Sequence, residues 1–142
     1  KYEDIKTYIQ SGNVVLRSQK KPDANIISLV QNKFGFKSEV LALDESDFIS
    51  AIKNNPYKSK DGKTIHFYFC KSNPEVDSEK MKMLKSDSEE YSINGKVLYL
   101  YAPNGIGRSK LVAKIESCLG VPTTGRNFNT INKLQSMVIN NA

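Results

Sequence analysis

The dipeptide Asn94-Gly95 is the strongest constraint on how this chain can fold. It lies between two runs rich in β-branched and aromatic residues, at 91–93 and 96–101. A two-residue hairpin turn needs positive φ at both central positions, and asparagine and glycine adopt such angles more readily than other residues. The sequence therefore predicts that the two runs pair as antiparallel strands joined by this turn.

The segments around this hairpin predict a β-α-β-β-α-β unit. Residues 64–70 favour a strand, and a charged helix is expected over 75–85. After the hairpin, apolar residues recur at helical spacing over 109–119, with Gly120 as the stop, and 121–124 favour a short strand. This order of elements is that of the ferredoxin-like split βαβ fold.

The N-terminal part of the chain predicts the same order without its first two elements. Strands are expected at 5–9 and 14–17, with the hairpin signal Gly12-Asn13 between them. A helix over 22–34 and a strand over 39–43 follow. The first half therefore reads β-β-α-β, so a β-α unit is missing from its start.

Together these patterns predict an α+β protein made of two ferredoxin-like halves (βαββαβ), the first lacking its initial β-α unit, plus a C-terminal helix over 127–138. The incomplete first half and a linking helix at 44–54 are expected within residues 1–52. A polar connection is expected at 53–63, and the second half with the C-terminal helix at 64–142. A chain of 142 residues can bury a core without a metal or a disulfide.

The charge of the chain is unevenly distributed. The formal net charge is +6, and from residue 96 onward six Lys and Arg residues stand against Glu116 alone, so this third holds +5 of it. Such asymmetry favours phosphate-bearing partners. The alternative is a solvated basic face of an ordinary protein.

Cysteine spacing and hydropathy bear on the compartment. Cys70 and Cys118 have neither CxxC nor metal-ligand spacing, which favours reduced thiols, although a single disulfide stays open. No apolar run approaches the roughly 18 residues of a membrane span. We therefore expect a cytoplasmic protein without membrane association, and no cofactor or metal.

The first candidate site is the segment 105–110, with Gly105, Gly107, Arg108, Ser109 and Lys110. A helix start leaves backbone N–H groups unpaired, so an anion is favoured there. Glycines let a ligand approach the backbone, and an arginine binds an oxyanion through two parallel hydrogen bonds. The alternative is a glycine turn in which Ser109 caps the helix and the basic side chains face solvent.

Two further segments offer groups of the same kind. Arg126, Asn127 and Thr130 begin the last predicted helix, although Asn127 is also a good helix cap. In the N-terminal hairpin, Gln10, Ser11 and Asn13 supply neutral hydrogen-bonding groups. Turn chemistry alone also accounts for the serine and asparagine there.

Aromatic residues of two predicted strands suggest a stacking platform. His66 alternates with Tyr68 on one strand, and Tyr99 with Tyr101 on another, and these strands are neighbours in a ferredoxin-like sheet. The four rings could then stack nucleic-acid bases on one face. The alternative is that this face packs on the other half or on a helix. With one histidine and no GxSxG motif, no catalytic residue is predicted.

Three motifs, in this order along the chain, carry a resemblance to a known family. They are Thr7-Tyr8-Ile9-Gln10-Ser11-Gly12-Asn13-Val14; Tyr101 with Pro103, Gly105, Gly107, Arg108, Ser109, Lys110 and Leu111; and Arg126-Asn127 with Thr130, Lys133 and Leu134. The chain resembles a bacterial family catalogued as domain of unknown function 1697. The resemblance implies an α+β protein without an assigned activity, so no catalytic residue is carried over. Members usually begin with a strand and a helix around a Leu-Arg-Gly-Ile-Asn-Val-Gly-Gly motif, which is absent here.

We therefore expect a non-enzymatic binding protein whose basic corner, Arg108, Lys110 and Arg126, recognises a phosphate-bearing ligand, either nucleic acid or an anionic small molecule. One alternative is an enzyme that holds a small phosphorylated or carboxylated substrate at the same corner. The other is a structural or protein-interaction domain in which the motifs only stabilise turns. A closed pocket joining the motifs would favour the enzyme, and an open basic surface would favour nucleic acid.

Overall fold

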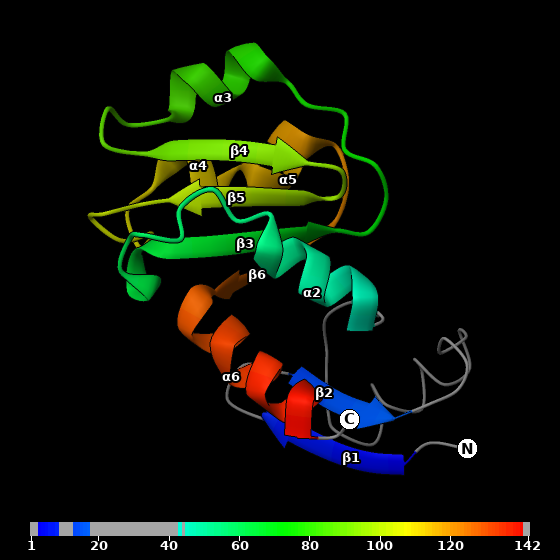
Figure 1. Cartoon of the computed structure of the whole chain (residues 1–142). Helices are drawn as coiled ribbons and strands as arrows, with labels where there is room; N and C mark the ends of the chain where they lie inside the picture. The colour runs from blue at the N-terminus through cyan, green and yellow to red at the C-terminus, as the bar shows by residue number, and fades with distance from the viewer. Residues whose placement is uncertain (1–2, 9–12, 18–42, 44, 141–142) are drawn as a thin grey trace. The chain divides into compact units, whose positions relative to one another are not determined.

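The computed structural model describes residues 3–8, 13–17, 43 and 45–140, and the chain divides into two compact units (Figure 1). The first unit comprises residues 1–52 and 132–142, and the second comprises residues 53–131. The helix predicted over 22–34 and most of the strand predicted over 39–43 lie outside the described residues.

The first unit contains a hairpin and a helix. Strands β1 (Glu3–Tyr8) and β2 (Asn13–Arg17) pair antiparallel, which confirms the two strands expected there. Helix α2 (Glu45–Lys53) buries Phe48 and Ala51 and confirms that a helix forms where one was expected, at 44–54. It carries acidic residues in its first turn and Lys53 in its last, as the helix dipole favours.

The second unit is built on a sheet with the strand order β4-β5-β3-β6, in which all neighbours are antiparallel. The strands are β3 (Ile65–Cys70), β4 (Glu90–Asn94), β5 (Val97–Tyr101) and β6 (Thr123–Asn127). Helix α3 (Ser78–Leu84) connects β3 to β4. Helices α4 (Lys110–Ala113) and α5 (Ile115–Leu119) connect β5 to β6, and α6 (Phe128–Asn140) follows β6 directly. The protein is therefore α+β, as predicted.

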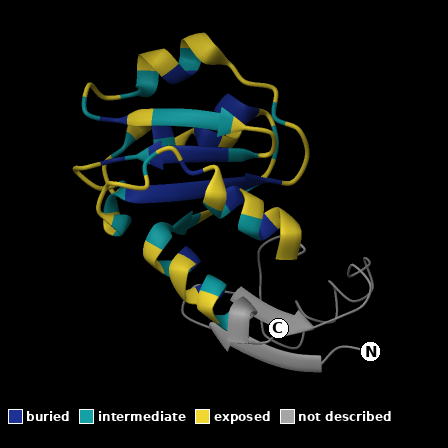
Figure 2. Ribbon diagram, in the orientation of Figure 1, coloured by how far each residue is buried: buried dark blue, intermediate teal, exposed yellow. Residues whose placement is uncertain are grey.

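Helices α3, α4 and α5 cover one face of this sheet. Their apolar side chains pack with those of β3 and β5 in one buried cluster. Its members are Tyr68, Cys70, Leu98, Leu100 and Ala102 from the strands and the segment after β5, and Met81, Leu111, Ile115, Cys118 and Leu119 from the helices. Figure 2 shows this buried layer between the strands and the exposed outer sides of the helices. Removing this apolar area from water is the main term that holds the helices to the sheet.

The opposite face of the sheet is aromatic. Phe67 is fully buried, and its ring lies 4.8 Å from that of Tyr99, 5.5 Å from that of Phe128 and 6.0 Å from that of Phe69, measured between centroids. Aromatic pairs at such distances add to the stabilisation that burial itself gives. Consequently every residue of β3 is buried, whichever face its side chain takes.

Three of the differences between the predicted and the observed elements change the local geometry. The hairpin turn is Gly95-Lys96, because Asn94 already pairs with Val97, and Gly95 has the positive φ of +59° that such a turn needs. The expected helix over 109–119 is interrupted at Lys114, whose φ and ψ of −119° and 20° are not helical. The end of the second helical piece at Gly120 (φ +70°) is as predicted. Strand β6 extends to Asn127, so residues expected to begin the last helix still belong to the sheet.

None of the helices in the described ranges has both the length and the apolar character that crossing a membrane requires.

Candidate functional site

Residues 105–110, which we call the basic turn, follow β5 through two consecutive hydrogen-bonded turns. The N–H of Gly105 donates to the carbonyl of Ala102 (3.0 Å), and that of Ser109 donates to the carbonyl of Ile106 (3.1 Å). Gly105 has φ +84°, so its turn requires glycine. Gly107 has no such angle, and a Cβ placed there would meet nothing within 4 Å. The fold itself therefore gives no reason for glycine at 107, and the backbone is open to an approaching group.

Ser109 has a structural role in this turn. Its Oγ accepts the N–H of Val112 at 3.1 Å, and so caps α4. Because α4 has four residues, its dipole is too weak to favour an anion as a longer helix would. Any attraction for an anion at the basic turn must come from its side-chain charges and its open backbone.

Those charges have no partners in the described part of the protein. Arg108 and Lys110 are exposed, and within the residues that the structure describes neither side chain makes an ion pair or a hydrogen bond. Lys63, by contrast, lies 3.8 Å from a carboxylate oxygen of Asp61. Two neighbouring cations without a carboxylate repel each other, and an anion between them would relieve that repulsion.

The second predicted segment lies at the junction of β6 and α6. Arg126 is opposite Phe67 and therefore projects to the aromatic face, away from α4. Its Nη1 donates to the carbonyl of Gly125 at 2.7 Å, and burial lowers the pKa of its guanidinium. The strand register thus does not place Arg126 on the face that carries the basic turn.

Asn127 and Thr130 belong to the start of α6. The Oδ1 of Asn127 accepts the N–H of Asn129 at 2.7 Å, and its Nδ2 donates to the carbonyl of Lys63 at 3.3 Å. Asn127 therefore caps α6, which is the alternative role considered for it, and joins β6 to the 3₁₀ helix at Gly62–Thr64. Thr130 lies half-buried in the first turn of α6.

Of the three predicted residues in the N-terminal hairpin, only Asn13 lies within the described part of the chain. Gln10 and Ser11 lie outside the described residues. Asn13 begins β2 opposite Tyr8, which fixes its backbone position in the first unit. Their role in ligand binding stays a prediction.

The prediction of a stacking platform is wrong. Strand β3 pairs with β5 so that Phe67 is opposite Tyr99 and His66 is opposite Leu100. Since cross-strand partners share a face, His66 and the two tyrosines of β5 lie on opposite faces. The alternative, a packed face, holds: Tyr99 is buried. Tyr101 stacks on Tyr57 at 5.9 Å.

The one histidine of the chain predicts a pH-dependent stability. His66 is buried, its Nε2 has no hydrogen-bond partner among the described residues, and burial lowers its pKa from the ordinary 6.5. As the pH falls through 6.5, the unfolded chain takes up a proton before the folded protein does. The free energy of unfolding should therefore be highest above that pH and decrease below it.

Urea denaturation between about pH 7.5 and about pH 5 measures this decrease. The His66→Leu variant should show a nearly flat profile over this range, because no other side chain of the chain normally titrates there. A variant that loses stability with falling pH as steeply as the wild type would contradict the assignment to His66.

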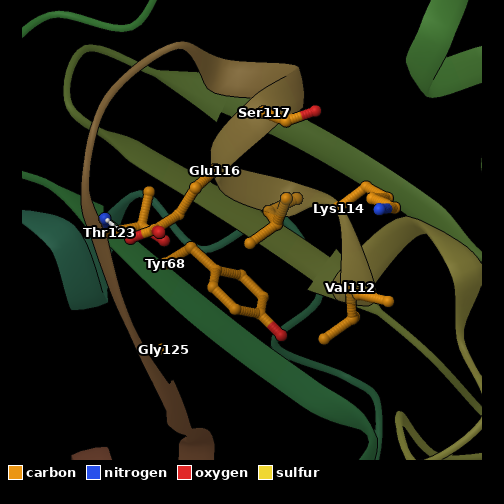
Figure 3. A pocket seen from close by; sticks show the side chains of 9 residues that line it. Tyr68, Val112, Lys114, Glu116, Ser117, Thr123 and Gly125 are labelled. Carbon is orange, nitrogen blue, oxygen red and sulfur yellow. Dashed lines mark hydrogen bonds between the residues drawn. The ribbon is translucent and has the colours of Figure 1, made fainter.

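Sequence reasoning missed a pocket of about 450 Å³ on the helix-covered face of the second unit. It lies between the α4–α5 segment and strands β3 and β6 (Figure 3). Apolar groups of Val112 and Ile115 and the polar side chains of Tyr68, Lys114 and Glu116 line it. The one sequence signal for this pocket is Gly125, because a glycine inside a strand often marks a close approach by another group.

The pocket differs chemically from the basic turn. It presents a phenol, an ammonium and a carboxylate together, whereas the basic turn presents cations alone. Neither Arg108 nor Lys110 lines the pocket. Over the described ranges, no three His, Cys, Asp or Glu side chains gather closely enough to hold a metal ion.

Comparison with known proteins gives one match. No curated protein and no solved structure is significantly similar to the chain. A family model described as "Protein of unknown function (DUF1697)" matches residues 1–99, which include the motif Thr7–Val14 and end before the basic turn. The match covers more than half of the 142 residues. The chain therefore belongs to the DUF1697 family of proteins of unknown function.

Proposed function

We propose that the second unit is a ferredoxin-like half. The support comes from its connections: α3 leads from β3 to β4 past the intervening β5, and α4–α5 lead from β5 to β6 past β3. Two such interleaved crossovers, with their helices on one face, are the arrangement of a split βαβ unit. The hairpin of β1 and β2 would then belong to a second, incomplete half.

The function that the geometry supports best is binding of a phosphate-bearing polyanion, such as nucleic acid, at the basic turn. The observation that carries this proposal is the exposure of Arg108 and Lys110 without partners in the described part of the chain, beside the open backbone of Gly107. A guanidinium binds phosphate through two parallel hydrogen bonds, and an ammonium adds a point charge. The net charge of +6 would also speed the approach of a polyanion.

An extended ligand fits this surface better than a small substrate does. A Cβ at Gly105 or at Gly107 would meet no described atom within 4 Å, so the backbone is uncovered at these two glycines. The nearby pocket contains neither of its cations. A small substrate needs a concave site that buries most of its surface, whereas a polyanion gains from several contacts on an open surface.

The salt dependence of binding tests the proposal. The affinity of the full chain for a fluorescein-labelled single-stranded oligonucleotide, measured by fluorescence anisotropy, should fall steeply between about 50 and about 200 mM salt. The log–log slope should be roughly 0.7–0.9 per phosphate contact. The variant with Arg108→Ala and Lys110→Ala should bind more weakly and with a smaller slope.

A charge-matched variant serves as the control. Lys82 on α3 and Lys96 in the β4–β5 turn are both exposed, and replacing both with alanine removes the same net charge. This control should bind nearly as the wild type does. Binding that does not depend on salt, or an equal loss in both double variants, would refute a site at the basic turn. The Arg126→Ala variant, measured in parallel, shows whether the opposite face of the sheet contributes.

A further inference from the structure

The pocket beside α4 and α5 carries an inference that is independent of the polyanion site. Its lining residues all belong to the second unit. Its volume of about 450 Å³ lies within the range of sites that take small organic ligands. Three observations bear on what it would hold: the position of the Tyr68 ring, the state of its hydroxyl, and the placement of two charges.

The ring of Tyr68 lies across the backbone of Gly125 on the neighbouring strand. An ideal Cβ at Gly125 would be 2.5 Å from Cε1 of Tyr68 and 2.9 Å from Cδ1, closer than real Cβ contacts. Glycine weakens the middle of a strand, because it has no side chain to pack and loses more backbone entropy than other residues. In β6 the glycine weakens the strand, but it also leaves room for the phenol ring of Tyr68. The ring can therefore lie against the strand and form the wall of the pocket.

The hydroxyl of Tyr68 lacks a partner. The residue is 5% exposed, and within the described part of the chain its hydroxyl makes no hydrogen bond. Water still reaches this oxygen, and a ligand in the pocket could replace that water as its hydrogen-bond partner. Burial and the nearby Glu89 carboxylate raise the pKa of Tyr68 to about 12, so the hydroxyl keeps its proton at neutral pH and can donate it.

The charged side chains of the pocket are placed at different ends. Glu116 reaches toward Thr123, whose N–H donates to its Oε2 at 2.8 Å, and Lys114 lies on the other side of the pocket (Figure 3). Lys114 is exposed and has no ion pair among the described residues. The hydroxyl of Ser117 is already engaged by Nζ of Lys80. An unpaired ammonium and an unpaired phenol donor therefore remain available, while the carboxylate is held by the backbone.

We propose that this pocket binds a small organic anion with an apolar body, whose anionic head accepts the hydroxyl proton of Tyr68 and lies near Lys114. The side chains of Val112 and Ile115 would cover the apolar body. A carboxylate and a phosphate head share this chemistry, so the experiment must separate them.

Isothermal titration calorimetry of the full chain with four probes tests this proposal. Phenylacetate and 4-methylpentanoate carry a carboxylate on an apolar body, phenyl phosphate carries a phosphate, and phenylacetamide is a neutral analogue of the first. At least one of the anions should bind at one site per chain with a Kd below about 1 mM, and the amide should not. Which anion binds tighter identifies the head group. If no anion binds at concentrations up to about 10 mM, or if the amide binds as well as phenylacetate, the proposal is wrong.

Two single variants assign the binding to the pocket. Tyr68→Phe and Lys114→Gln should each lower the affinity for the anion about ten- to a hundredfold, which is the usual effect of losing a hydrogen bond to a charged group. Tyr68→Phe removes only an oxygen that makes no hydrogen bond within the described part of the chain, so it should fold as the wild type does. Wild-type affinity in both variants would overturn the assignment.

The variant with Arg108→Ala and Lys110→Ala separates the two sites. It should bind the small anion as the wild type does while losing the oligonucleotide, and Tyr68→Phe should show the reverse. A small anion that is lost together with the oligonucleotide would refute the pocket and leave the polyanion proposal intact.

Discussion

The Phe67→Ala variant should lose about 3–5 kcal/mol of its free energy of unfolding. Phe67 is fully buried, and its ring is the common member of contacts with Phe69, Tyr99 and Phe128. Truncation removes the transfer free energy of the ring, leaves a cavity and deletes the edge-on contacts at once. Since a domain has about 5–15 kcal/mol in total, this loss is a large fraction of the stability, and the urea midpoint should shift strongly to lower concentration. Urea denaturation followed by circular dichroism measures the change.

Two companion variants keep this result interpretable. Phe67→Leu retains much of the side-chain volume, so its loss of stability should be clearly smaller than that of the alanine variant. Met83, on the outer side of α3, is 77% exposed, and Met83→Ala should change stability by less than about 0.5 kcal/mol. If Phe67→Ala cost no more than Met83→Ala, the aromatic face would not be the packed layer described above.

The Gly125→Ala variant should lose about 1–3 kcal/mol of its free energy of unfolding. The new Cβ would be 2.5 Å from Cε1 of Tyr68, and a rigid buried ring cannot move aside without disturbing its neighbours. The displacement should also abolish binding of the small anion, because it moves the hydroxyl that we propose as its donor. Urea denaturation and calorimetry give the two readouts.

A double-mutant cycle tests whether the contact with the Tyr68 ring causes this loss of stability. In a Tyr68→Val background no side-chain atom extends as far as Cδ1, so adding a methyl group at 125 should cost much less than in the wild type. Gly107→Ala is the matched control, since its Cβ would meet nothing within 4 Å. An alanine at 125 tolerated as easily as an alanine at 107 would contradict the observed contact.

Local signals predicted the elements well where one residue type determined the geometry. A glycine between two β-rich runs predicted the positive φ at residue 95, and a glycine after a helical pattern predicted the helix end at residue 120. The exact turn, Gly95-Lys96, was not readable. The N–H of Cys70 donates to the carbonyl of Lys96 at 2.7 Å, and such a contact between distant segments leaves no local pattern.

The register between two paired strands likewise could not be predicted from the sequence. Alternation shows which residues of one strand share a face, but it does not show which face of a neighbouring strand they join. His66 and Tyr99 were therefore placed together, although the register of β3 with β5 separates them. The same limit hid the pocket, because its two key residues, Tyr68 and Gly125, are brought together only by the pairing of β3 with β6.

The basic turn could be predicted because its two charged residues lie only two positions apart in the chain. Arg108 and Lys110 follow two glycines within six residues, and the structure leaves both side chains exposed. The length of the following helix was not readable, since the interruption at Lys114 is a backbone feature without a glycine or a proline to mark it.

The central strand has a consequence for how a nucleic acid would be recognised. Every residue of β3 is buried, and so is Tyr99 beside it, so the centre of the sheet offers no ring on which bases could stack. Recognition at the basic turn would then depend on the sugar-phosphate backbone alone, which is identical in every sequence. Affinity should increase with the length of the strand and be indifferent to its base composition, and an unrelated polyanion such as heparin should compete for the same surface.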